Sequence, residues 1–130
     1  MIPLVSEIGW ADNTKFGPKA IYVKLTNNDV AQLNAGDWVE FNGNDGFKTP
    51  TGDTIPMGVL VEDTLSAVDG WVQVWGFYSG AKVAGGLLAN TALMLANATT
   101  NAALLVAGSV KCGTILTAEA GGIADVWIGQ

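Results

Sequence analysis

The chain has 130 residues, carries 12 acidic side chains against six lysines for a net charge of −6, and contains neither histidine nor arginine. Histidine is the commonest protein metal ligand, and arginine is the preferred clamp for phosphate and carboxylate groups. Nucleic-acid binding needs clustered Lys and Arg, but these lysines are scattered. We therefore expect a binding or structural protein of one domain, with no cofactor, no bound metal, and neither nucleic acid nor membrane as partner.

Charged residues make up only 14% of the chain and hydrophobic residues 49%. An average soluble protein has about 25% charged residues, so few charges are available to cover the surface. Large exposed apolar patches usually mark contacts with other proteins. Part of the surface is therefore expected to meet other subunits or a partner. The alternative is a compact β-barrel with a neutral surface of Asn, Thr and Ser.

Residues 1–19 differ from the rest, because prolines and glycines interrupt them and their apolar residues follow no sustained period. Terminal segments are disordered unless they are held down. We expect an extended arm that packs on its own domain or lies along a neighbour. The first residues lack the basic region and long apolar run of a signal peptide, so a cytoplasmic protein is expected. The apolar side chains that the arm offers for contact are those of Ile2, Pro3, Leu4, Val5, Ile8 and Trp10.

From residue 20 onward, short runs rich in β-branched and aromatic residues alternate with turn signals, which is typical of an all-β barrel or sandwich. The Asn-Gly turn at 42–46 favours the positive φ angles of tight hairpins. Residues 91–107 are expected to form a hairpin, although their Leu and Ala content also allows a helix. The sequence predicts a small β-barrel-like or sandwich-like domain over residues 20–130. Its expected strands are 20–25, 38–41, 57–62, 70–78, 91–96, 102–107, 113–118 and 123–128.

The clearest strand, 70–78, is largely apolar on both of its expected faces. One of these faces is expected to carry Trp71, Gln73, Trp75 and Phe77. Strands of this composition are buried on both sides, here within a barrel and against another subunit. We therefore predict that Trp71, Trp75 and Phe77 lie at a subunit interface.

The stretch from Val83 to Val110 carries no charge over 28 residues. Gly, Asn and Thr interrupt it so often that no apolar run approaches the ~18 residues that span a membrane. Its composition predicts soluble β structure rather than a membrane segment.

Few arrangements in the chain could support catalysis. Ser79 and Lys82 are a candidate Ser–Lys pair for nucleophilic catalysis, but their spacing is common in any loop. Paired carboxylates can hydrolyse glycosides, and Glu40, Glu62 and Asp63 are the candidates beside tryptophans. Glu62 and Asp63 are adjacent, so on a strand they point to opposite faces and do not flank one bond. No catalytic residue is therefore assigned. A small enzyme that relies on Asp and Glu stays open as an alternative, and it predicts a carboxylate with a strongly raised pKa.

Metal and disulfide chemistry are equally poorly supported. The acidic turn 42–46 resembles part of a calcium loop, but the required spacing puts Phe41 at the first ligand position. Cys112 is the single cysteine, which excludes an intramolecular disulfide and is typical of a small buried hydrophobe. We expect no metal site.

Five tryptophans, at positions 10, 38, 71, 75 and 127, are many for so short a chain. Their apolar neighbours favour roles in the core and at interfaces. The alternative is a carbohydrate-binding β module, which predicts at least two tryptophans exposed on one face.

The order of turns resembles that of the head-decoration, or capsid cement, proteins of tailed bacteriophages. The similarity covers roughly residues 20–130 and is one of pattern, without a sharp signature. The segments that carry it are 35–39, 56–60, 69–74 followed by Gly76, 112–118, 121–122 and 126–128.

This resemblance implies a compact β-barrel-like domain that assembles as a homotrimer on the outer capsid surface of the virion, after synthesis in the host cytoplasm. Such trimers clamp neighbouring major capsid proteins against internal DNA pressure, often with help from an N-terminal arm. Residues 1–19 suit this role, because an extended segment can add a strand to an exposed sheet edge. Pro3 and Pro18 are expected to limit that strand to the stretch between them.

Overall fold

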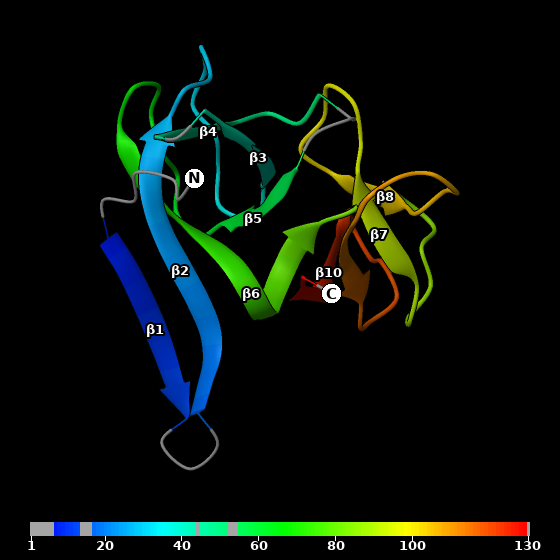
Figure 1. Ribbon diagram of the computed structural model, residues 1–130. Helices are drawn as coiled ribbons and strands as arrows, with labels where there is room; N and C mark the ends of the chain where they lie inside the picture. The colour runs from blue at the N-terminus through cyan, green and yellow to red at the C-terminus, as the bar shows by residue number, and fades with distance from the viewer. Residues whose placement is uncertain (1–6, 14–16, 44, 52–54, 130) are drawn as a thin grey trace.

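The computed structural model describes residues 7–13, 17–43, 45–51 and 55–129 (Figure 1). The regular secondary structure of these residues is β throughout, which confirms the all-β prediction. The part of the chain that the structure describes holds no helix suited to crossing a membrane. The strands are β1 (Glu7–Asn13), β2 (Gly17–Asn27), β3 (Trp38–Asn42), β4 (Gly46–Lys48), β5 (Pro56–Leu60), β6 (Asp69–Lys82), β7 (Ala92–Leu95), β8 (Ala102–Leu104), β9 (Lys111–Ile115) and β10 (Ile123–Ile128).

Five of the strands close into a barrel, as the sequence predicted. β2 pairs with β4, β4 with β3, β3 with β5, β5 with β6, and β6 pairs back with β2 (Figure 1). A closed ring removes the free edges at which sheets aggregate. We call residues 17–75 the barrel lobe. Its buried core consists of Leu25, Leu33, Val39, Phe47, Met57, Leu60 and Val72.

The second half of β6 leaves the barrel and begins a second sheet, in the order β6-β10-β9-β7-β8. The far edge of β8 returns to the end of β6, because Ala102 forms a bridge with Val83 and its carbonyl accepts the Ala84 N–H at 2.8 Å. We call residues 76–129 the second lobe. Its buried side chains are Ala81, Val83, Leu93, Leu95, Ala102, Cys112, Ile115, Ala124, Val126 and Ile128.

β6 serves both lobes because it bends sharply between them (Figure 1). Gly76 lies at the bend with a φ of +102°, a backbone conformation that favours glycine. The buried amide of Gln73 donates to the carbonyls of Trp75 at 3.2 Å and Phe77 at 2.8 Å, so it spans the bend. These contacts satisfy backbone acceptors on both sides of the corner and hold its shape.

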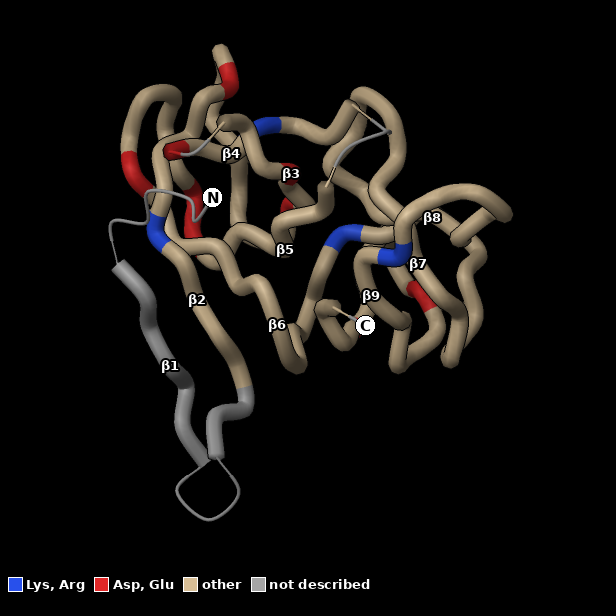
Figure 2. Tube along the Cα trace, in the orientation of Figure 1, with Lys and Arg blue, Asp and Glu red and all other residues tan. Residues whose placement is uncertain are grey.

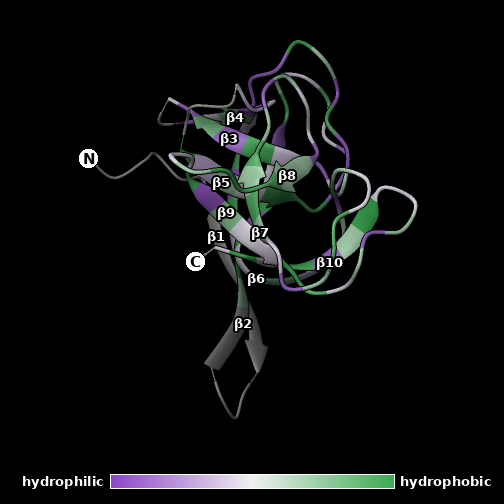
Figure 3. Cartoon of the chain, turned by 90° about the vertical axis from the view of Figure 1, so that its right-hand side faces the viewer, coloured by the Kyte–Doolittle hydropathy of each residue, from purple (hydrophilic) through white to green (hydrophobic). Residues whose placement is uncertain are grey.

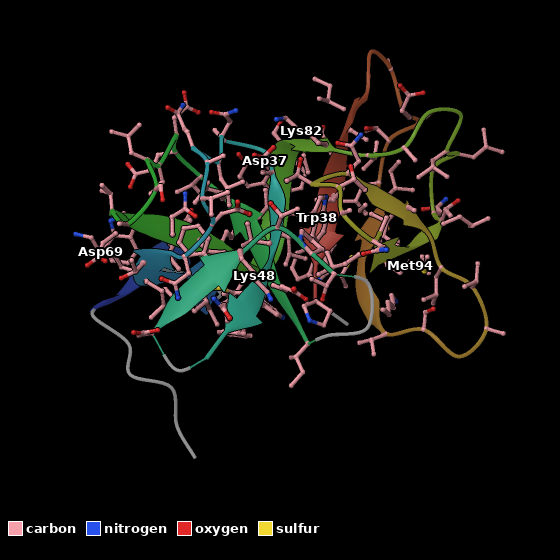
Figure 4. The ribbon with its side chains drawn as sticks, turned by 90° about the horizontal axis from the view of Figure 1, so that it is seen from above. Asp37, Trp38, Lys48, Asp69, Lys82 and Met94 are labelled. Atoms are coloured by element: carbon pink, nitrogen blue, oxygen red, sulfur yellow. The ribbon has the colours of Figure 1, made fainter. Side chains whose placement is uncertain are left out.

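Trp38 joins the two lobes. It begins β3 in the barrel lobe, yet its fully buried side chain belongs to the core of the second lobe, and Figure 4 shows it between them. Gly113 makes room for it, because a Cβ there would lie 3.2 Å from the indole ring. The indole N–H finds no hydrogen-bond partner among the described residues. Packing therefore outweighs the cost of an unsatisfied donor at this position.

The predicted hairpins are largely confirmed. β7 and β8 pair antiparallel, with Leu95 opposite Ala102, within the segment whose composition also allowed a helix. That helix alternative is wrong, because Leu93 and Leu95 are buried at the period of two that a strand requires. The turn at 42–46 joins β3 to β4 and includes Gly43 at a φ of +70°.

β1 and β2 form a hairpin that extends below the barrel in Figure 1. β1 pairs with residues 17–24 of β2, whereas β6 pairs with β2 only from Ala20 onward. The predicted boundary between residues 19 and 20 therefore falls inside β2. The strand of the arm, β1, ends at Asn13, within the stretch that Pro18 was expected to limit, and Pro18 itself lies within β2 beside an irregularity where the register with β1 shifts. Bulges are positions where strands accommodate proline.

Candidate protein-interaction surface

A bulge in β6 decides which aromatic side chains share a face. The register with β2 shifts at Val74, which has no partner on that strand. Because a shift of one residue reverses the facing of later side chains, Trp75 and Phe77 lie on the opposite side of the sheet from Trp71. The expectation that these three residues share one face is therefore wrong.

Trp127 joins Trp75 and Phe77 instead. Phe77 lies directly opposite Trp127 in the pairing of β6 with β10. The rings of Trp75 and Trp127 pack edge to face, with centroids 4.9 Å apart and planes at 79°, a favoured aromatic geometry. Phe77 is 48% exposed and the two tryptophans are half-buried. We call these three residues the aromatic face. Trp127 was not among the predicted interface residues, although its alternation with buried Val126 and Ile128 marks it as outward-facing.

Trp71 lies elsewhere, on the outside of the barrel. The ammonium group of Lys24 lies 5.7 Å from the centroid of its ring, within cation–π range. The backbone N–H of Trp71 donates to the carboxylate of Glu62 at 3.4 Å. These local contacts leave Trp71 half-buried within its own chain.

The structure describes only part of the predicted arm. Ile2, Pro3, Leu4 and Val5 lie outside the described residues. The backbone of Ile8 and Trp10 lies in β1, opposite Val23 and Ile21, and their side chains are not among the described ones. β1 therefore borders β2, the strand whose Ile21 pairs with Trp75 of the aromatic face.

The second lobe exposes a further set of aliphatic side chains. Its uncharged segment contributes most of them, and Figure 3 shows hydrophobic colour in loops as well as in strands. Exposed apolar groups of this kind add nothing to the core of a monomer, so they are available for contact with other proteins. The members are Leu88, Leu104, Val106, Val110, Leu116 and Ile123.

The candidate nucleophile pair does not assemble. The Ser79 hydroxyl donates to the carboxylate of Asp125 at 2.8 Å. The Lys82 ammonium instead donates to Asp37, whose side chain is buried. Each of the two groups is therefore engaged by a different carboxylate.

The candidate carboxylates also have separate partners. Glu40 is buried and accepts hydrogen bonds from the N–H of Thr51 at 3.1 Å and from its hydroxyl at 3.0 Å, with the Lys48 ammonium at 3.8 Å. Asp63 accepts the N–H of Ala35 at 2.9 Å. Within the described ranges, no group of three or more His, Cys, Asp or Glu residues is placed to hold a metal ion.

Shifted pKa values have plain local causes. Burial raises the pKa of the Cys112 thiol to about 12, so this thiol is inert at neutral pH. The N–H groups of Gly86 and Gly122 donate to Glu119 and lower the pKa of its carboxyl. Burial acts to raise the pKa of Asp29, but hydrogen bonds, chiefly from Thr49, outweigh it and the net shift is downward.

No protein-family model and no curated protein matches this chain. The case for a function therefore rests on its own residues: an aromatic face on β6 and β10, a projecting β1–β2 hairpin beside it, and exposed aliphatic groups on the second lobe.

Proposed function

We propose that this chain is a structural, non-catalytic virion protein that binds the outer surface of a phage capsid as a homotrimer and joins neighbouring major capsid subunits. The observation that carries the proposal is the aromatic face of Trp75, Phe77 and Trp127, placed beside a hairpin that extends beyond the barrel (Figure 1). The resemblance in turn order to capsid cement proteins supplies the identity of the partner.

The aromatic face has the composition of an interface centre. Trp and Tyr dominate binding hot spots, and Phe is enriched in interface cores. Full burial of a side chain such as Phe77 is worth about 1.5–3 kcal/mol. A stable contact buries ~1,600 Å² in total, which requires neighbouring surface as well. The exposed aliphatic groups of the second lobe offer that area.

The β1–β2 hairpin is suited to contact with the capsid shell. β1 pairs on one side with β2, and the barrel closes through β2 and β6 without it. The hairpin can therefore engage a partner while the barrel keeps its fold. Many copies on one shell then multiply modest individual contacts by avidity.

Sedimentation analysis of the purified chain tests the self-association. The wild-type protein is expected to sediment as a trimer and the Phe77→Asp variant as a monomer, because the new carboxylate would be buried without a partner. Ile55→Asp is the matched control, since Ile55 is 73% exposed and lies outside the aromatic face. A monomeric wild type, or a Phe77→Asp variant that stays trimeric, contradicts the proposed assembly.

Deletion of residues 1–12 tests the hairpin. The barrel is expected to stay folded, because its ring of strands does not include β1. Attachment to particles is expected to weaken, since the strand that leads the hairpin is lost. Co-sedimentation with capsids measures the attachment, and circular dichroism checks the fold. Undiminished attachment would contradict the role given to the hairpin.

Carbohydrate binding is a second candidate, favoured by the grouping of three aromatic rings on one face. It predicts quenching of tryptophan fluorescence by soluble sugars, which Phe77→Ala would weaken. Fluorescence that sugars leave unchanged would count against carbohydrate binding and favour the structural role.

A further inference from the structure

Two loops at one end of the barrel lobe carry aliphatic side chains that the fold does not use. They are residues 28–34 and 62–69, which we call the acidic tip. Val30 is 96% exposed, Leu65 61% and Val68 47%. Aliphatic groups of this size contribute to stability only when a partner covers them, because burial removes their apolar surface from water.

The two loops are fastened together around one buried side chain. The amide of Asn27 donates to the carbonyls of Ala31 at 3.1 Å and Thr64 at 2.9 Å. The hydroxyl of Ser66 donates to the carbonyl of Asp29 at 2.6 Å. The exposed aliphatic groups therefore stand on an ordered backbone, and binding there costs less conformational entropy than binding to a loose loop.

The two loops themselves carry charge of a single sign, with Lys24 next to them on β2, where its ammonium lies over the ring of Trp71. The loops contain the carboxylates of Asp29, Glu62, Asp63 and Asp69 and no lysine. Figure 2 shows acidic residues gathered on the loops at the upper left, whereas the second lobe at the right carries only Lys82, Lys111, Glu119 and Asp125. Lysines pair with buried carboxylates elsewhere, at Lys48–Glu40 and Lys82–Asp37.

We propose that the acidic tip is a docking site for a basic protein surface, an apolar patch bordered by Lys or Arg on the capsid protein that the chain decorates. This inference rests on the proposed function and assigns the tip, in addition to the hairpin, to contact with the shell. Complementary charge selects a basic occupant. A second copy of the chain is disfavoured, because two tips in contact would bring eight like charges together.

The two parts of the tip have separate roles. The aliphatic groups supply affinity, because their burial removes apolar surface from water. The carboxylates orient the partner and speed the encounter, an effect that salt screens. Removing the aliphatic groups should therefore weaken binding at every salt concentration, whereas neutralising carboxylates should weaken it only at low salt.

The test uses particles stripped of this chain and rebound with purified full-length protein. Val30→Ser/Leu65→Ser is expected to bind about tenfold more weakly than wild type, in line with the loss of two interface anchors. Ile55→Ser, which removes an aliphatic group outside the tip whose exposure lies between those of Val30 and Leu65, is the matched control. Circular dichroism and the trimer mass check that each variant is folded.

A second variant tests the charge. Glu62→Gln/Asp63→Asn keeps acceptors for the N–H groups of Trp71 and Ala35. It is expected to bind several-fold more weakly than wild type in about 50 mM salt and equally well in about 1 M salt, where the Debye length falls from over 10 Å to about 3 Å.

Each outcome separates the inference from the proposed function. Binding of Val30→Ser/Leu65→Ser at wild-type strength overturns the docking site and leaves the proposed function standing. Tighter binding of Glu62→Gln/Asp63→Asn also overturns it, because an acidic occupant or a second copy would then be covering the tip. Absence of the wild-type chain from the particles before stripping overturns the proposed function and the docking site together.

Discussion

The barrel lobe and the second lobe are both built of β-strands, yet they bury different chemistry. The described polar side chains that are fully buried all lie in the barrel lobe: Asn27, Asp37, Glu40, Thr64 and Gln73. The second lobe buries aliphatic residues, small residues and the single cysteine. The charged residues are also distributed unevenly, since the barrel lobe carries most of the carboxylates, whereas the second lobe carries two, Glu119 and Asp125, with two lysines (Figure 2).

This difference shows that the two lobes are stabilised by different kinds of contact. Buried polar groups need specific partners, so they define particular loop conformations in the barrel lobe. Aliphatic packing is less directional and tolerates change in shape. The two lobes are joined through the bend of β6, through Trp38 and through the Lys82–Asp37 ion pair.

The largest expected effect comes from breaking the link between the lobes. Trp38→Ala removes a fully buried ring from the core of the second lobe, and we expect a loss of about 3–5 kcal/mol in the free energy of unfolding. Trp38→Phe is expected to cost less, since it keeps most of the packing and removes the unpartnered N–H. Urea unfolding followed by circular dichroism measures both. Equal losses for the two variants would contradict the role given to packing.

A smaller effect is expected from Asp37, a buried polar group of the barrel lobe that pairs with Lys82 of the second lobe. The buried carboxylate of Asp37 accepts from the Asn34 N–H at 2.7 Å and from the Lys82 ammonium. Asp37→Ala leaves both donors without this acceptor, and we expect a loss of about 2–3 kcal/mol. Asp37→Asn keeps an acceptor and should lose less. A loss below about 0.5 kcal/mol for Asp37→Ala is typical of an ordinary surface change. It would contradict the claim that buried polar contacts stabilise the barrel lobe.

The smallest effect concerns acid, and it compares one carboxylate in each lobe. Asp29 and Glu119 both have folded-state pKa values below their ordinary values of 3.8 and 4.5. A lowered folded-state pKa contributes stability that is fully present above the ordinary value and is lost as the pH falls through the folded value. Asp29→Asn and Glu119→Gln should each flatten the decline in the urea midpoint between about pH 5 and pH 2. An unchanged decline in both variants would show that these hydrogen bonds do not stabilise the fold.

Local chemistry predicted much of the fold. The Asn-Gly turn at 42–46 and the last strand, 123–128, follow from turn residues and alternation, and both are confirmed. The sharing of β6 between two lobes could not be predicted, because it depends on pairings between strands that are distant in sequence.

The candidate surfaces were harder to predict than the strands. Nothing near Val74 marks a bulge, so strict alternation placed Trp71 on the same side of the sheet as Trp75 and Phe77, whereas the structure places it on the opposite side. Trp127 joined them through the pairing of β10 with β6. The exposed position of Val30 depends on loops that are held together by a buried asparagine, and such contacts leave no signal in a local pattern.

Quantitative peptide mass spectrometry of gradient-purified capsid particles from the source lysate tests the central claim most directly. The account predicts this chain in the particle fraction at close to one copy per major capsid protein, as repeated decoration of a shell requires. Recovery of the chain only in the soluble fraction would contradict a structural role in the virion and would put carbohydrate binding by the aromatic face first.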